Sequence, residues 1–200
     1  MIRKLISVMI IIVLVICMAG CTSSNNMADS AVKAAKQYGI EEVADLGELF
    51  KAVSNTSDAY FVGSGEESSR AYAEIFNSSN SLPQKEVDKV IFVVVFEKPN
   101  PSTFNRCQCT VVVFKDSKDA SEIYGKCIES MLHKDGVSNG EDKGLSYTFE
   151  RDEKGTTATS PMFRGFYLKD NCVIKCTCPV NSGDSSDFCD YFLKKMELKS

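Results

Sequence analysis

The chain has 200 residues and a net charge of −4 at pH 7. This length is enough for one domain with a sizeable buried core. The mild acidity opposes nucleic-acid binding, which needs clustered Lys and Arg against phosphates, and no polybasic patch is present for anionic lipid headgroups. We therefore expect a single folded domain without a nucleic-acid partner.

The first twenty residues have the layout of a secretory signal peptide. Arg3 and Lys4 form a basic start, Leu5–Met18 is an almost unbroken apolar run, and two small residues follow. A membrane-spanning helix needs about 20 apolar residues, so this shorter run favours a cleaved signal over a retained anchor. We expect residues 1–20 to be removed, which leaves a net charge of −6 because they carry two of the 23 basic residues and none of the 27 acids.

The end of this segment, Met18-Ala19-Gly20-Cys21, resembles the lipobox of bacterial lipoproteins, in which an apolar and two small residues precede a lipidated cysteine. The resemblance implies that Cys21 is the first mature residue and carries acyl chains. These chains would anchor the protein to the cell membrane on its extracytoplasmic side, at the cell surface or in the periplasm. An ordinary signal peptide with a chance cysteine is the alternative. Residues 21–28 are then the lipidated cysteine and a polar tether, and residues 29–200 form one domain.

The part of the chain after the tether begins with mainly helical patterns. Apolar residues recur at helical spacing from Val43 to Val53, which predicts a buried face that includes Phe50. The sequence Ser64-Gly65-Glu66-Glu67 has the pattern of a capping box, which opens a helix. The predicted elements are helices over 29–38 and 41–53, a short strand over 59–62, and a helix from the capping box to residue 76.

Strand patterns dominate the second half. Val90–Phe96 is a continuous run of β-branched and aromatic residues, which is typical of a strand covered on both faces. Asp116 or Ser117 then caps an amphipathic helix that runs to His133. The remaining predicted elements are strands over 107–114, 145–149, 162–168 and 172–178, and a final helix from about Asp184.

Together these patterns predict an α+β fold. We expect an antiparallel sheet of about four to six strands, with helices that return to one of its faces. Two segments, near 90–133 and 162–197, each consist of two strands followed by a helix. A loose repetition of two ββα units is therefore an open alternative to an unrepeated fold.

Seven cysteines follow the signal region, and their odd number leaves at least one without a partner in the chain. Alternation along a strand places Cys107 and Cys109 on the face of Val111. The three cysteines of 172–178 likewise share the face of Ile174, and the two helical cysteines lie on apolar stripes. All seven are therefore predicted to face the core: Cys107, Cys109, Cys127, Cys172, Cys176, Cys178 and Cys189.

Three chemical states are open to these thiols. Reduced core residues are favoured, because cysteine packs as a small hydrophobe. Disulfides are the alternative, because an exported chain with many cysteines often contains them. A metal site is least favoured, because structural zinc sites usually use Cys-x₂₋₄-Cys on turns and thiolates are costly in an apolar layer.

No other motif identifies a catalytic, cofactor-binding or metal-ligating residue. His133 fits the C-terminal end of a helix, where a cation is mildly favoured. Gly63-Ser64-Gly65 could cradle an anion, but the two glutamates that follow favour a capping turn. Four oxygen-bearing residues in one expected loop lack the spacing of a calcium hand: Asp135, Asn139, Glu141 and Asp142.

The sequence thus identifies Cys21 as the one site residue, for lipid attachment. Beyond the anchor, we expect a non-enzymatic domain that binds an envelope protein or a small ligand at the membrane surface. The alternative is a cysteine-dependent redox protein or other enzyme of the envelope, which would need polar, titratable groups that converge in a pocket.

Overall fold

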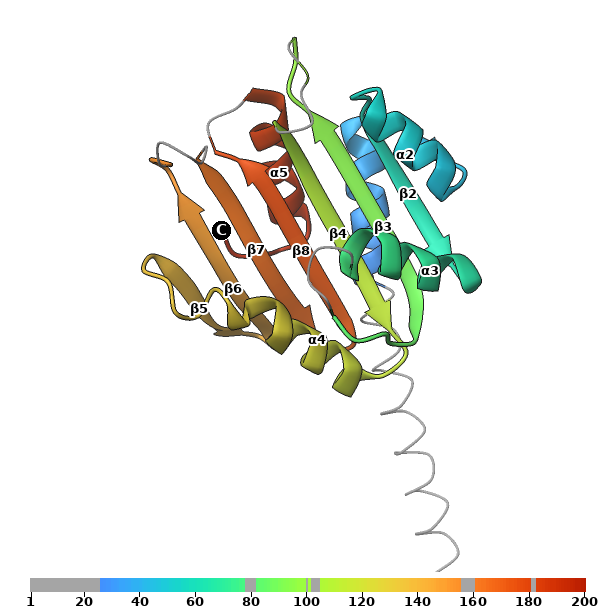
Figure 1. Cartoon of the computed structure of the whole chain (residues 1–200). Helices are drawn as coiled ribbons and strands as arrows, with labels where there is room; N and C mark the ends of the chain where they lie inside the picture. The colour runs from blue at the N-terminus through green and yellow to red at the C-terminus, as the bar shows by residue number, and fades with distance from the viewer. Residues whose placement is uncertain (1–25, 78–81, 100, 102–104, 156–160, 181–182) are drawn as a thin grey trace, which may run out of the picture.

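A computed structural model describes residues 26–77, 82–99, 101, 105–155, 161–180 and 183–200. The expected signal peptide and Cys21 lie outside these ranges. Among the described residues, eight strands form one sheet in the order β1-β2-β3-β4-β8-β7-β6-β5, antiparallel except for the β1–β2 pair (Figure 1). The strands are β1 (Glu42–Val43), β2 (Ala59–Ser64), β3 (Val87–Phe96), β4 (Arg106–Phe114), β5 (Val137–Asp142), β6 (Leu145–Asp152), β7 (Met162–Lys169) and β8 (Cys172–Pro179).

Helices cover both faces of the sheet. One face, called here the α5 face, packs against the N-terminal helix of residues 26–38 and against α5. The opposite face, called the α4 face, packs against α2, α3, η1 and α4. The bounds are α2 (Leu46–Ser54), α3 (Glu66–Ala71), the π-helix η1 (Tyr72–Asn77), α4 (Ser117–Glu129) and α5 (Gly183–Lys195).

The predicted α+β class is confirmed, with a larger sheet than expected. The strand β5 was missed because only Val137 of its six residues is partly buried, so it shows no alternation of apolar and polar positions. The expectation that helices return to one face was wrong. Every residue of β3 from Val90 onward is buried, and such a strand must be covered on both sides.

The two ββα segments differ in three dimensions. Helix α4 follows β3 and β4 and lies on the α4 face, whereas α5 follows β7 and β8 and lies on the opposite face. The cysteine-bearing strands β4 and β8 are nevertheless neighbours and pair in antiparallel register. The two segments therefore share an order of elements but not an arrangement around the sheet.

The folded part of the chain begins earlier than residue 29. The N-terminal helix already includes residues 26–28, and Met27 and Ala28 belong to the buried core. Residues 26–28, which were expected in the tether, therefore belong to the folded domain. No helix within the described ranges has both the length and the apolar character needed to cross a lipid bilayer.

The start of α2 differs from its prediction. Residues 42–43 pair with β2 as β1, so the helix begins at Leu46, where the Asp45 side chain accepts a hydrogen bond from the Glu48 backbone at 2.9 Å. Leu49 is buried, whereas Phe50 is 40% exposed, contrary to the expected buried face. This exposure makes Phe50 available to line a cleft.

The predicted capping box before α3 is wrong, although the helix itself is present through η1. Gly65 occupies the cap position at φ +61°, and no side chain caps the helix. The Ser68 hydroxyl instead contacts the carbonyl oxygens of Gly65 and Val87, at 2.7 and 2.8 Å. The contact with Val87, the first residue of β3, links the start of α3 to the sheet.

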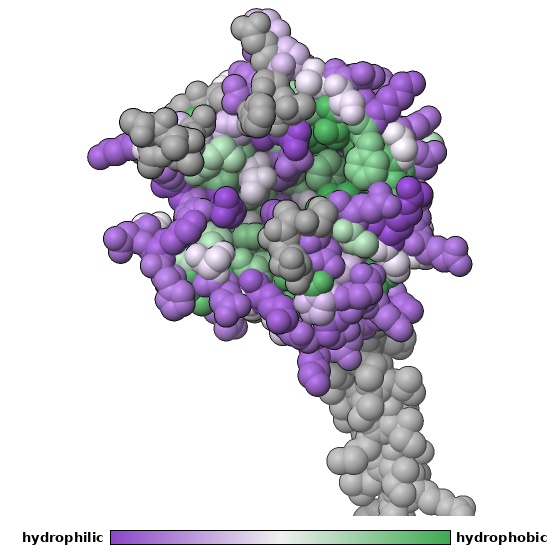
Figure 2. Space-filling model, in the orientation of Figure 1, coloured by the Kyte–Doolittle hydropathy of each residue, from purple (hydrophilic) through white to green (hydrophobic). Residues whose placement is uncertain are grey.

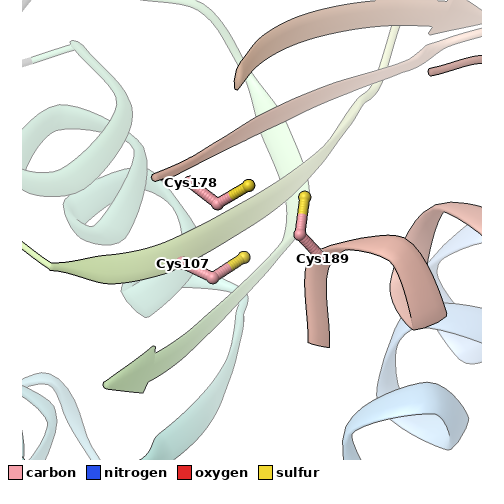
Figure 3. A group of neighbouring side chains, drawn as sticks. All are labelled: Cys107, Cys178 and Cys189. Carbon is pink, nitrogen blue, oxygen red and sulfur yellow. The ribbon is translucent and has the colours of Figure 1, made fainter. Parts of the chain in front are cut away.

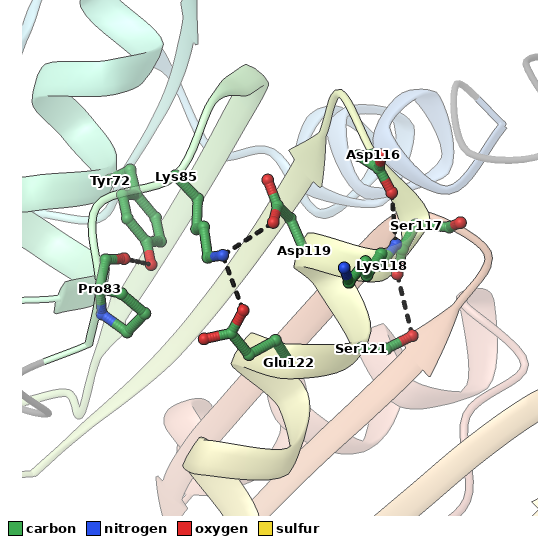
Figure 4. Close-up of polar contacts among 9 residues, drawn as sticks. All are labelled: Tyr72, Pro83, Lys85, Asp116, Ser117, Lys118, Asp119, Ser121 and Glu122. Carbon is green, nitrogen blue, oxygen red and sulfur yellow. Dashed lines mark hydrogen bonds and ion pairs between the residues drawn. The ribbon is translucent and has the colours of Figure 1, made fainter.

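The start of α4 agrees with its prediction. Asp116 accepts a hydrogen bond from the Lys118 backbone at 2.6 Å and is the N-cap (Figure 4). Lys85, which lies just before β3, forms ion pairs with Asp119 of this helix at 2.8 Å and with Glu122 at 2.7 Å. The α4 helix ends at Glu129, four residues before the predicted end.

Candidate functional site

A cleft of about 300 Å³ opens on the α4 face, between α2, η1 and the central strands. Figure 2 shows this face, where hydrophobic residues are visible in a hollow beside α2 that hydrophilic residues border. Its apolar lining comes from α2, η1 and β3: Leu49, Phe50, Val53, Ile75 and Phe92. Its polar lining comes mainly from β4 and β8: Arg106, Gln108, Thr110, Lys175 and Thr177, with Glu74 from η1.

Strand alternation explains why polar side chains gather here. On β4, Arg106 and Gln108 point to the α4 face, while Cys107 points to the α5 face. On β8, Lys175 lies on the cleft side and Cys176 on the other. The two central strands are therefore polar toward the cleft and apolar toward α5.

The two cations of the cleft are held in a poorly hydrated environment. Burial lowers the pKa of Arg106. Burial also lowers the pKa of Lys175; the nearby Cys127 thiol opposes this shift, and the charge of Arg164 adds to it. The Lys175 ammonium lies 6.0 Å from the ring centres of both Phe76 and Phe166. These rings offset only part of the lost hydration.

Neither cation has an acidic partner within the described ranges. Gln108, with its amide oxygen turned toward the guanidinium, accepts hydrogen bonds from Arg106 Nε at 3.0 Å and Nη2 at 3.2 Å. Glu74, at the edge of the cleft, is bound to Arg70 at 2.7 Å. The cleft therefore has a positive interior that a negatively charged group would complement.

A cluster of thiols lies behind the cleft, on the α5 face. Cys109 of β4 is directly opposite Cys176 of β8, and the Cys107 and Cys109 sulfurs are 3.7 Å apart. The sulfurs of Cys107, Cys178 and Cys189 all lie within 4.8 Å of one another, and Figure 3 shows them pointing toward a common centre. Five thiols from three elements thus meet in one buried patch.

One of these thiols differs from the others in the direction of its pKa shift. Burial raises the pKa of Cys107 and of Cys109. Hydrogen bonds from the thiols of Cys107 and Cys189 instead lower the pKa of Cys178, and the charge of Arg151 acts in the same direction. The pKa of Cys178 is therefore shifted in the opposite direction to those of the other four thiols of the patch.

The prediction that all seven cysteines face the core is confirmed. Each is buried and free in the structure. Cys172 lies on the α5 face, in the register pair of Val113 and outside the group of three, and Cys127 lies on the α4 face. The structure thus distinguishes clustered thiols from isolated ones, which spacing alone could not do.

The other predicted site residues do not converge. His133 is exposed in the turn after α4, and Cys21 lies outside the described residues. The acidic stretch expected as a loop is mostly the edge strand β5, where Asp142 pairs with Lys199 at 2.9 Å. Gly65 borders a shallow hollow that also contains Glu66 and Glu86, which is unfavourable for an anion.

Sequence reasoning missed the cleft and both of its cations. Arg106 and Lys175 are single basic residues, 69 positions apart in the numbering, in strands that are otherwise apolar or polar and uncharged. The one available signal was their position in strands expected to be central. Charged residues are rare in buried strands, so those that occur there often serve a specific interaction.

No protein family matches the sequence. No curated protein matches it either. Among solved structures, the chain is similar to the extracellular domain of PknH from Mycobacterium tuberculosis, with 8% identity and a TM-score of 0.37 over 78% of this chain and 92% of that one. A similarity at this level carries no argument about function.

Proposed function

We propose that this chain is a lipid-anchored extracytoplasmic binding protein whose cleft takes a small organic anion. The anchor rests on Met18-Ala19-Gly20-Cys21 and the apolar run before it. The described N-terminal helix includes residue 26, and five peptide units after Cys21 reach at most about 18 Å. Acyl chains on Cys21 would therefore hold the domain close to the bilayer.

The observation that carries the binding proposal is the pair of cations, Arg106 and Lys175, in one cleft without an acidic partner among the described residues. Both residues are partly buried, and a charge that has lost part of its hydration without gaining a counter-charge is costly to keep. An anionic ligand would supply that counter-charge, and charge-assisted hydrogen bonds are stronger than neutral ones. The two side chains thus fit the recognition of a carboxylate, sulfonate or phosphate group.

The remaining lining of the cleft defines the other part of the ligand. Phe50, Val53 and Ile75 of α2 and η1 present apolar surface beside the polar strands. A volume of about 300 Å³ is at the lower end for small-molecule sites. The ligand class is therefore a compact organic anion with an apolar body.

Binding is favoured over catalysis because of the groups that line the cleft. They include one carboxylate, Glu74, and neither histidine nor cysteine. Acid–base or nucleophilic catalysis generally needs at least two such groups in mutual contact. The clustered thiols, which the alternative redox function would use, are on the other side of the sheet and buried.

A matched pair of fluorescent probes tests the cleft. 8-Anilinonaphthalene-1-sulfonate carries a negative charge, and N-phenyl-1-naphthylamine has the same ring system without it. Arg106→Gln and Lys175→Met should each weaken binding of the sulfonate about tenfold, equivalent to about 1.4 kcal/mol, and leave the neutral probe unaffected. Lys194→Met, an exposed lysine of α5, is the control. Equal effects on both probes, or none on the sulfonate, would refute the anion site.

A separate experiment tests the anchor. Cells that express Cys21→Ala should produce uncleaved protein without radiolabelled fatty acid, whereas Cys172→Ala should be labelled like the wild type. Cys172 is the suitable control because it is buried in β8. Equal labelling of wild type and Cys21→Ala would contradict the lipoprotein proposal without bearing on the cleft.

A further inference from the structure

Three cysteines converge from three separate elements on the α5 face. Cys107 comes from β4, Cys178 from β8 and Cys189 from α5, and their sulfurs lie within 4.8 Å of one another (Figure 3). All three are buried, with Cys178 only 3% exposed. Their positions are fixed by the sheet register and by the packing of α5, and not by a flexible loop.

Packing alone does not account for sulfur at these positions. On the same two strands and the same face, Val111 lies opposite Ile174. Aliphatic residues therefore fit this layer well. Two residues farther along the same face, Cys109 lies opposite Cys176. Beyond this pair, Cys107 and Cys178 lie next to Cys189 of α5. Sulfur is concentrated where α5 closes over the sheet.

We propose that Cys107, Cys178 and Cys189 form a three-thiolate site for a soft metal ion of low coordination number, with copper(I) as its representative. Thiolates are the ligands that select copper(I). At a metal–sulfur distance of about 2.3 Å, sulfurs around a trigonal centre are about 4 Å apart, which the group satisfies with small adjustments. The ion binds without any change of oxidation state, and it displaces the protons of the thiols that ligate it.

The same geometry disfavours a four-coordinate zinc site. A tetrahedral site needs a fourth ligand within about 4 Å of the other three. Cys109 is 3.7 Å from Cys107 but is not among the sulfurs that are all mutually within 4.8 Å. Its sulfur is instead within hydrogen-bond distance of the Cys107 sulfur, and an S–H group donated to a ligating Cys107 thiolate would offset part of the negative charge of the bound site.

Competition for copper(I) tests the site. The full-length chain, purified in detergent and reduced under argon, is titrated with copper(I) against bathocuproine disulfonate. We expect one ion per chain, and at least a hundredfold loss of affinity in Cys178→Ala and Cys189→Ala. Cys172→Ala is the matched control, because Cys172 is buried on the same strand and face but lies outside the group. X-ray absorption at the copper edge should show three sulfur neighbours.

Three results would overturn the site. The protein could fail to bind copper(I) more tightly than the competitor does, Cys172→Ala could lose as much affinity as Cys178→Ala and Cys189→Ala, or the copper could lack three sulfur neighbours. A zinc(II) titration that recruits Cys109 as fourth ligand would overturn the three-coordinate geometry. Thermal melting of each metal-free variant separates loss of ligand from loss of fold, and a variant that melts like the wild type yet still binds copper(I) refutes its residue as a ligand. Probe binding to the cleft should be the same in all the cysteine variants.

Discussion

Arg106 and Cys107 are adjacent on β4, yet their side chains enter opposite layers of the protein. Arg106 lines the cleft on the α4 face, and Cys107 joins the thiol patch on the α5 face. Lys175 and Cys176 repeat this relationship on β8. Two neighbouring central strands thus supply both candidate sites, one on each side of the sheet.

Substitution of two glycines by alanine should have opposite effects on stability. At Gly165 of β7, an added Cβ would lie 2.7 Å from Tyr167 Oη and 3.0 Å from Phe163 Cζ. Tyr167 cannot move freely because its hydroxyl donates to the Lys199 carbonyl. We expect Gly165→Ala to lower the free energy of unfolding by about 2 kcal/mol.

The matched substitution is Gly125→Ala in α4, where an added Cβ meets nothing within 4 Å. Alanine has the higher helix propensity, so this variant should be more stable by about 0.5–1 kcal/mol. Urea-induced unfolding of both variants measures the two values. Destabilisation by Gly125→Ala, or no effect of Gly165→Ala, would contradict the packing described for these positions.

Lys175→Met should stabilise the protein at neutral pH while weakening anion binding. Burial lowers the lysine pKa in the folded state, so the charged form is costly there. Between this lowered pKa and the ordinary lysine value the unfolded chain binds more protons, and wild-type stability therefore rises with pH. We expect a gain of about 1 kcal/mol at pH 7 that shrinks as the pH approaches 10.

Unfolding measured from pH 7 to 10 for wild type, Lys175→Met and Lys194→Met checks this behaviour. The exposed Lys194 serves as control, and its variant should follow the wild type at every pH. A Lys175→Met protein that is less stable than the wild type at pH 7 would show that the ammonium is well paired in the free protein, which the anion proposal does not allow.

The thiols should be reduced and protected in the folded protein. All seven described cysteines are free and buried, so maleimide labelling of native protein should be slow. Unfolding without reductant should expose at least five of the seven, counted by peptide mass spectrometry. A single labelled position before reduction, rising to seven after it, would instead establish a disulfide framework.

Truncations test the boundaries of the folded unit. Deletion of residues 22–25 should leave a cooperatively melting domain, whereas deletion of 22–28 should cost at least about 2 kcal/mol because Met27 and Ala28 leave the core. Removal of everything after Met162 should abolish cooperative melting, since β8 pairs with both β4 and β7. Sharp melting of the piece that ends at Met162 would contradict a single folded unit.

Much of this architecture follows from short-range sequence signals. The apolar run of β3 and the alternation of β4 and β8 were sufficient to place these strands and the faces of their cysteines. The polar edge strand β5 carried no such signal, because it has almost no buried side to reveal it. The cleft was not predictable, since its lining comes from five elements that only the tertiary fold brings together.

The convergence of the thiols could likewise not be predicted from the sequence. Alternation shows that Cys107 and Cys178 face the core, but not that β4 and β8 are neighbours in the register that aligns them. The contribution of Cys189 depends on α5 packing over this part of the sheet rather than returning to the α4 face.

The most direct measurement for the proposed function is the identity of small molecules carried by the protein. Wild type and an Arg106→Gln/Lys175→Met double variant are isolated from their own membranes in mild detergent, and the released compounds are compared by mass spectrometry. A compact organic anion should accompany the wild type near one equivalent and be at least tenfold depleted in the double variant. Identical compounds in both samples, or a ligand that is neutral or cationic, would contradict an anion-binding cleft.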